Sequence, residues 1–315
     1  MKPITGTFID EITWDIPSQN WGAKEWRREF DTMRQAGIDT VIIIRASRRD
    51  EAIFPSEVLG CLDAPDLAQL FLDEAHRCGM KLFFPSHDSA ALDPTWSNWR
   101  ADWEVCRKFL PEVMRRYGDH PAFHGWYIAP ENCHDTPGVR EIYQRYSSLM
   151  KELAPEKPVL ISPWYPSDVY EHETPEARHA NFRRDWENIL RNTPAVDIAA
   201  FQDGACTCRP VEQSATYELA DYIREAAEVC AQAGVALWNN AETFGRRFPI
   251  RFPPIDWRTL KRKLEICDPY AEKHITFEFS HFMSPNSMYP SARTLYDRYR
   301  EEILGETEAQ KGERE

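Results

Sequence analysis

Two glutamates follow apolar runs and stand beside residue types that suit chemistry on a sugar. Glu131 ends the segment GWYIAPE, after Trp126 and Tyr127, and Glu242 follows two asparagines in WNNAETF. Aromatic neighbours would partly desolvate Glu131, which raises the pKa of a carboxylic acid and suits a general acid. A second carboxylate on the other side of a glycosidic bond would attack the anomeric carbon or activate water. The motifs predict cleavage of a glycosidic bond by Glu131 as acid/base and Glu242 as nucleophile or base, although either could be an ordinary loop charge.

Further polar and aromatic residues fall at the ends of other apolar runs. Sugar sites combine such groups, because carboxylates and amides bind hydroxyls while aromatic rings cover the apolar faces of the sugar. The residues expected to bind the substrate are Asp10, Arg45, His87, Trp126, Tyr127, Asn132, Trp164, Gln202, Asp203, Asn240, Glu278 and His281. Asp10 and Glu11 are adjacent, so only one of them can point to a given face of a strand. Asp203 and Glu278 are alternatives to Glu242 as the second carboxylate.

The apolar runs that carry these residues recur at an even spacing. Eight runs start 34 to 42 residues apart, at 5–12, 39–46, 81–86, 123–129, 158–164, 197–203, 235–240 and 274–280. Between them, apolar residues repeat three or four positions apart, as in amphipathic helices. Eight strand–helix units in 315 residues predict a single (β/α)₈ TIM barrel, whose chemistry lies at the carboxyl ends of the strands. A doubly wound sheet is disfavoured because no glycine-rich phosphate loop follows a strand.

Composition and charge limit the partners and the location of the protein. We expect the barrel to span 1–304 as a catalytic domain, and the charged stretch 305–315 to be a disordered tail. A net charge of −13 disfavours nucleic acid and anionic membrane surfaces. No apolar run is long enough to span a membrane. The N-terminus lacks a signal-peptide core, which predicts a cytoplasmic protein unless a signal has been removed. Nothing in the sequence indicates the oligomeric state.

Cysteines raise one alternative that involves a metal. Cys133 and His134 follow the fourth apolar run, and Cys206 and Cys208 follow the sixth. Four such ligands at one end of a barrel could hold zinc, but their spacing matches no common zinc pattern. We therefore expect neither a metal nor a cofactor. The eight cysteines are typical of buried free thiols in a reducing compartment.

Four motifs give the chain a family resemblance. TGTFIDEI, GWYIAPE, ISPWY and FQDG are similar to segments of a bacterial glycoside-hydrolase-like barrel family catalogued as a domain of unknown function. More distantly, the chain resembles the clan of retaining barrel glycosidases, which carry an Asn-Glu acid/base after the fourth strand and a glutamate nucleophile after the seventh. The resemblance assigns these roles to Glu131 and Glu242. The chain departs from the clan in one respect, because Asn132 follows the glutamate instead of preceding it.

Three functions fit these observations, and all of them have a carbohydrate as partner. The leading interpretation is a glycoside hydrolase that cleaves an oligosaccharide or glycoside without a cofactor. A metal-dependent sugar isomerase or epimerase would instead use Glu131, Asp203 and Glu278 as metal ligands. A non-catalytic barrel would bind glycans and release no sugar. The fold alone cannot choose among them, because one barrel supports many chemistries.

Overall fold

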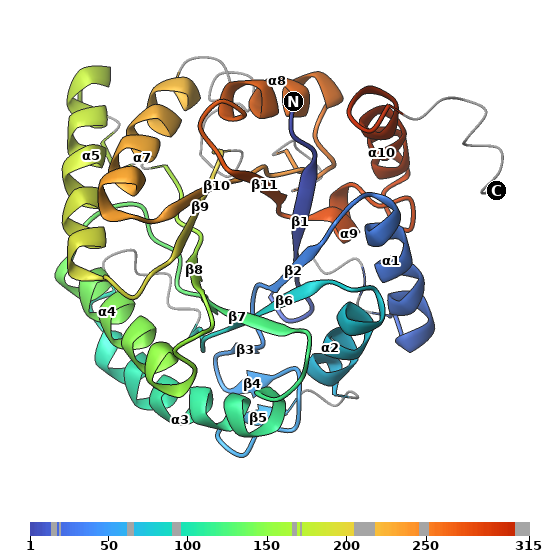
Figure 1. Ribbon diagram of the computed structural model, residues 1–315, viewed down its shortest axis with the longest axis horizontal. Helices are drawn as coiled ribbons and strands as arrows, with labels where there is room; N and C mark the ends of the chain where they lie inside the picture. Colours follow the sequence, from blue (N-terminus) through green and yellow to red (C-terminus); the bar gives the residue numbers. More distant parts are fainter. Residues whose placement is uncertain are drawn as a thin grey trace.

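Eight parallel strands close into a barrel in the computed structural model (Figure 1), which describes residues 1–13, 18, 20–61, 66–89, 96–165, 169–170, 172–204, 218–245 and 252–305. The barrel order is β1-β11-β10-β9-β8-β7-β6-β2. The strands are β1 (Ile4–Ile9), β2 (Thr40–Ile43), β6 (Lys81–Pro85), β7 (Phe123–Ile128), β8 (Val159–Ile161), β9 (Ile198–Gln202), β10 (Ala236–Asn240) and β11 (Lys273–Thr276). Each lies in one of the eight predicted runs or within one residue of it, so the predicted (β/α)₈ barrel is confirmed.

Helices surround the barrel on its outside (Figure 1). They are α1 (Ala23–Gln35), α2 (Leu67–Arg77), α3 (Trp99–Tyr117), α4 (Pro137–Leu153), α5 (Pro175–Asn192), α7 (Leu219–Ala233), α8 (Trp257–Cys267) and α10 (Pro290–Glu302), with the short α9 (Phe279–Phe282) after β11. Several helices begin where the sequence provides a cap. The side chains of Asp66, Thr136 and Thr174 accept hydrogen bonds from the first turns of α2, α4 and α5.

A small second sheet was not predicted from the sequence. It consists of β3 (Ser47–Arg48), β4 (Glu51–Ala52) and β5 (Gly60–Cys61), and it lies in the connection from β2 to α2. Strands of two residues are too short to show an alternating pattern, so periodicity could not reveal them. The backbone of Arg48 also bridges to Asp88 beyond β6, which joins this sheet to the carboxyl end of the barrel.

Alternate strand residues form two separate cores. The inner core fills the barrel with Phe8, Ile42, Ile44, Phe83, Tyr127, Ala129, Leu160, Ile198, Ala200 and Ile275. The outer core lies between strands and helices and includes Trp126 and Trp186. The inner core is packed closely enough to require glycine in one strand, because a Cβ at Gly125 would lie 2.5 Å from Cε1 of Phe83. The alternation therefore decides which side chains beyond each strand can reach the barrel axis.

The sequence also predicts a tail at the C-terminal end and no membrane-spanning segment. The expected tail is 305–315, of which 306–315 lies outside the described residues, so that domain boundary stays a prediction. Within the described part of the chain, no helix has the length and apolar character needed to cross a membrane.

Candidate active site

Glu131 lies at the carboxyl end of the barrel, beyond β7 and two residues after Ala129 of the inner core. It is half-buried, and the side chain of Gln202, at the end of β9, hydrogen-bonds to it. The Gln202 amide is fixed in turn, because its Nε2 donates to the Ser162 carbonyl at 2.9 Å. Two neighbouring strand ends therefore hold the Glu131 carboxyl in place.

The surroundings of Glu131 favour its neutral form. Burial is the largest effect and raises the pKa of Glu131, and the negative charges of Asp88 and Asp10 act in the same direction. The positive charge of Arg45 and the hydrogen bond from Gln202 oppose this, but the net shift is upward. A carboxyl group that keeps its proton to a higher pH suits general acid catalysis.

Arg45 is held by protein carboxylates and a hydroxyl. Its Nε forms an ion pair with Asp88, and its Nη1 lies 3.5 Å from the Thr13 hydroxyl. Burial disfavours the charge of Arg45, but Asp88, Glu131 and Asp10 outweigh that effect and raise its pKa above the ordinary value. Arg45 was expected to bind substrate. In the structure it organises the carboxylates of neighbouring strand ends.

Replacing Arg45 with glutamine should move the basic limb of the pH profile of kcat/KM to higher pH. Catalysis by an acid is lost as pH rises through the pKa of Glu131, and removing a nearby positive charge raises that pKa further. Arg45→Lys keeps the charge and should restore most of the original position of the limb. A limb that does not move in Arg45→Gln would show that Glu131 does not set it.

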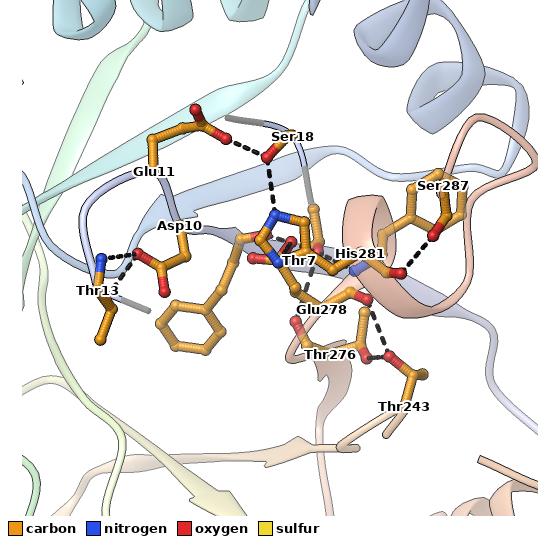
Figure 2. A network of polar contacts seen from close by, with 12 residues as sticks. Thr7, Asp10, Glu11, Thr13, Ser18, Thr243, Thr276, Glu278, His281 and Ser287 are labelled. Carbon is orange, nitrogen blue, oxygen red and sulfur yellow. Dashed lines mark hydrogen bonds and ion pairs between the residues drawn. The ribbon is translucent and has the colours of Figure 1, made fainter. Parts of the chain in front are cut away.

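Asp10 and Glu11 point in different directions, as their adjacency requires. The Asp10 Oδ1 atom accepts hydrogen bonds from the Thr13 hydroxyl at 2.6 Å and from the Thr13 amide at 3.1 Å. Figure 2 shows Asp10 turned toward Thr13 and Glu11 turned toward Ser18. This turn holds the buried Asp10 at the end of β1, where its charge acts on Arg45 and Glu131.

Glu242 lies two residues beyond β10 and is almost completely buried. Trp238 packs against the inner core, and the Asn240 amide donates to the Ser162 hydroxyl at 3.2 Å. Continued alternation places Glu242 on this same inner face. Its backbone is fixed on the outer side, where its amide donates to Asp203 at 3.2 Å and its carbonyl accepts from Lys263 at 2.8 Å.

Asp203 has a structural role, which corrects the expectation that it binds substrate or serves as the second carboxylate. Its Oδ1 lies 2.6 Å from Nζ of Lys263 on α8, and both side chains are buried. Asp203 therefore points outward from the strand end, while Gln202 before it points to the axis. The ion pair anchors the peptide of Glu242 to α8, since a buried charge requires a partner.

Glu278 and His281 form a pair at the end of β11. The His281 Nδ1 atom lies 3.0 Å from Glu278 Oε1, and both side chains are buried. On its other side, the His281 ring contacts Ser18, with 2.8 Å between Nε2 and the hydroxyl oxygen. Figure 2 shows this series of contacts continuing from Ser18 to Glu11.

Three residues expected to bind sugar face away from the barrel axis. Trp126 is fully buried in the outer core, with its ring edge-to-face against Phe123 at 4.8 Å. His87 is buried, and its Nδ1 lies 3.0 Å from the Ser47 hydroxyl. Asn132 is buried, and its side chain acts on the pKa of Tyr143 of α4. The reason is the same for each, because side chains of adjacent positions alternate between the axis and the helices.

Two other aromatic residues lie toward the axis or the open end. Tyr127, next to Trp126, belongs to the inner core and contacts Phe8 edge-to-face at 5.4 Å. Trp164 is half-buried beyond β8, where its backbone bridges to Gln202 and its amide donates to the Asn132 carbonyl at 3.0 Å. Trp164 is thus the better placed of the two predicted tryptophans to contact a sugar.

Truncation to alanine should lower the free energy of unfolding by different amounts at the two tryptophans. Trp126→Ala should lower the free energy of unfolding by about 3–5 kcal/mol, because it removes a large buried side chain from the outer core. Trp164→Ala is the matched control, since its half-buried ring should cost less stability. Denaturant unfolding of both variants tests this. Equal losses of stability would contradict the assignment of Trp126 to the core and Trp164 to the open end.

The metal alternatives find little support in the described part of the chain. Cys133 Sγ lies 3.3 Å from Nδ1 of His134, but Cys206 and Cys208 lie outside the described residues. Each of the three ligands of the isomerase alternative has a different charged neighbour. Glu131 lies near Arg45, Asp203 forms an ion pair with Lys263, and Glu278 forms an ion pair with His281. Over the residues that the structure describes, no three His, Cys, Asp or Glu side chains form a group able to hold a metal.

Four residues that shape the site were absent from the predicted set. Asp88 follows the third apolar run and Ser162 lies near the end of the fifth, so the rule that selected the other site residues could also have found them. Ser18 and Lys263 carry no such signal. Ser18 lies 263 positions before its partner His281, and Lys263 lies on the outer helix α8, so only the folded structure brings them to the site.

Comparisons with known proteins place the chain among glycosidase-like barrels. A family profile described as "Domain of unknown function (DUF4434)" matches residues 4–289. A solved structure from Bacteroides thetaiotaomicron VPI-5482, provisionally described as an alpha-L-fucosidase, is 36% identical with a TM-score of 0.84, over 95% of this chain and 92% of that one. No curated protein matches the sequence.

More distant structures share the fold alone. An endo-1,4-beta-D-mannanase from Thermotoga petrophila RKU-1 is 13% identical with a TM-score of 0.67, over 95% of this chain and 99% of that one. A GH2 beta-galacturonidase from Eisenbergiella tayi is 15% identical with a TM-score of 0.61, and the match covers 95% of this chain but 51% of that one. The family resemblance read from the four sequence motifs is confirmed.

Proposed function

Since the chain belongs to the family described as Domain of unknown function (DUF4434), whose fold is shared by glycosidases, we propose that it is a glycoside hydrolase. The observation that supports this most is the environment of Glu131. This carboxyl group is half-buried at the carboxyl end of the barrel, its neutral form is favoured, and Gln202 orients it. A protonated, oriented carboxyl is what a glycosidic oxygen needs to leave as a hydroxyl.

In the proposed reaction, Glu131 donates its proton to the leaving oxygen and Glu242 acts from the end of β10. Glu242 attacks the anomeric carbon if the enzyme retains configuration, or activates water if it inverts. Asp203 and Lys263 support Glu242 by fixing its peptide on the outer side. Gln202, Asn240, Trp164, Asp10 and Glu278 remain the side chains proposed to contact the sugar.

A panel of aryl glycosides tests the proposal on the purified protein. The panel begins with an α-L-fucoside, because the relative with 36% identity carries that description, and continues with a mannoside and other neutral glycosides. Release of the aryl alcohol by the wild-type protein, and its loss in Glu242→Gln, would support the proposal. If the protein binds sugars but releases none, the non-catalytic alternative is correct.

A further inference from the structure

Four side chains form a continuous series of contacts beside the proposed acid/base pair. Glu11 Oε1 accepts the hydrogen of the Ser18 hydroxyl, and the same hydroxyl oxygen lies 2.8 Å from Nε2 of His281. The other ring nitrogen of His281 lies 3.0 Å from Oε1 of Glu278. Figure 2 shows the four residues in this order, joining the end of β1 to α9. Glu11 is half-buried, whereas the other three are buried.

The number of hydrogens in this series fixes its protonation. Ser18 has one hydroxyl hydrogen, and that hydrogen is given to Glu11. The contact between Ser18 and His281 therefore needs a hydrogen on Nε2, and the ion pair with Glu278 needs a positively charged ring, so this arrangement has an imidazolium. The equivalent arrangement has a protonated Glu11, which donates to Ser18, which donates to a neutral His281. Both arrangements hold the same total number of protons. Without the shared proton, one of the two contacts of the His281 ring would have no hydrogen between its polar atoms.

The charged groups around the series keep that proton near neutral pH. Burial lowers the pKa of His281, but Glu278, Asp10 and Glu11 outweigh this and raise it above the ordinary value. Burial raises the pKa of Glu11 to about 7, against the opposing effects of Ser18 and His281. Glu29, on α1, is a further buried carboxyl near this series, and burial together with the charge of Glu278 raises its pKa to about 7. A group whose folded pKa is raised holds its proton below that value and loses it as pH rises.

We propose that Glu11, Ser18, His281 and Glu278 form a proton relay, which carries a proton between half-buried Glu11 and buried Glu278. In the inward direction, protonated Glu11 gives its hydrogen to the Ser18 oxygen, and Ser18 gives its own hydrogen to Nε2 of His281. The ring then gives the Nδ1 hydrogen to Glu278. Glu11 ends as a carboxylate and Glu278 as a carboxylic acid, while Ser18 is again a neutral hydroxyl and the neutral His281 ring now carries its hydrogen on Nε2 instead of Nδ1. Through this relay, the charge of Glu278 can change with the pH of the solvent although Glu278 is not itself exposed to water.

NMR titration of protein labelled with ¹⁵N-histidine and ¹³C-carboxyl glutamate tests the relay. Spectra of Glu11→Gln and His281→Gln assign the two signals. In the wild type, the His281 nitrogens and the Glu11 carboxyl should titrate with shared midpoints, because groups that share a proton titrate as one unit. Separate, independent midpoints for the two residues would overturn the relay. This readout needs no variant at Ser18.

Ser18→Ala distinguishes a relay from simple attraction between charges. Glu11→Gln should weaken proton binding at His281 by about tenfold in the wild-type background, and by much less when Ser18 is alanine. An equal effect in both backgrounds would overturn the proposal, because charge attraction alone does not need the hydroxyl. His274 is the internal control. It is another buried histidine near a carboxylate, Asp268 at 3.4 Å, and its titration should not change in any of these variants.

Discussion

Replacing Glu131 with glutamine should slow the cleavage of a glycoside with a poor leaving group by roughly 10²–10⁴-fold. Glutamine keeps the size of the side chain and its place beside Gln202 and Arg45, but it cannot donate the proton. An alkyl glycoside needs that proton, because its leaving oxygen would otherwise depart as a strongly basic alkoxide. Initial rates of sugar release by the wild type and the variant measure the loss.

A comparison of leaving groups makes this prediction specific to an acid. An activated aryl leaving group departs without much protonation, so the bond-breaking step of Glu131→Gln should be far less impaired on an aryl glycoside. Glu228→Gln is a matched control, since it makes the same chemical change on the outer surface of α7, where Glu228 pairs with Arg183. An equal loss on both leaving groups would mean that Glu131 is not the acid, and the roles of the two glutamates would have to be reassigned.

Replacing Glu242 with glutamine should abolish most activity on both kinds of leaving group. Attack on the anomeric carbon is needed whatever group departs, and removing one member of a catalytic group costs roughly 10⁴–10⁶-fold in well-studied hydrolases. In a retaining enzyme, the smaller Glu242→Gly variant should regain turnover when azide is added, and the product should be a glycosyl azide. Kinetics on the two substrates and identification of the product check this.

The role of Glu242 must be separated from damage to its surroundings. Its peptide is held by the buried pair of Asp203 and Lys263, so thermal melts should show that Glu242→Gln keeps a wild-type fold. If Glu242→Gln retains activity while Glu278→Gln loses it on both substrates, the second carboxylate is Glu278. That result would leave the glycosidase proposal intact and move the nucleophile from β10 to β11.

The fold could be predicted because its signal is repeated eight times. Each strand is a short apolar run, and small errors in its ends do not change the spacing of strand–helix units that closes a barrel. The ends of the strands matter more for the site, because a shift by one residue moves a side chain from the axis to the helices. Of the adjacent Trp126 and Tyr127, only Tyr127 is in the inner core, and sequence alone could not distinguish them.

Contacts between site residues that lie far apart in the sequence could not be predicted either. Glu131 and Gln202 could both be placed at strand ends, but the hydrogen bond between them depends on how β7 and β9, which lie on either side of β8, are staggered. The sequence pattern predicts that Asp203 is a site carboxylate, and only the structure shows that Lys263 of α8 is its ion-pair partner. The contact of Ser18 with His281 joins opposite ends of the chain, and no local pattern marks either residue as half of a pair.

The most direct test of the central claim is the release of free sugar, followed by ¹H NMR, from the glycoside panel by the purified wild-type protein and Glu131→Gln. NMR observes the anomeric proton of the product, so it reports cleavage and its stereochemical outcome together. The account predicts that the wild type releases sugar from at least one glycoside. It also predicts that Glu131→Gln is roughly 10²–10⁴-fold slower on the form with a poor leaving group. Release of no sugar by the wild type from any glycoside, or equal rates for the two proteins on the form with a poor leaving group, would contradict it.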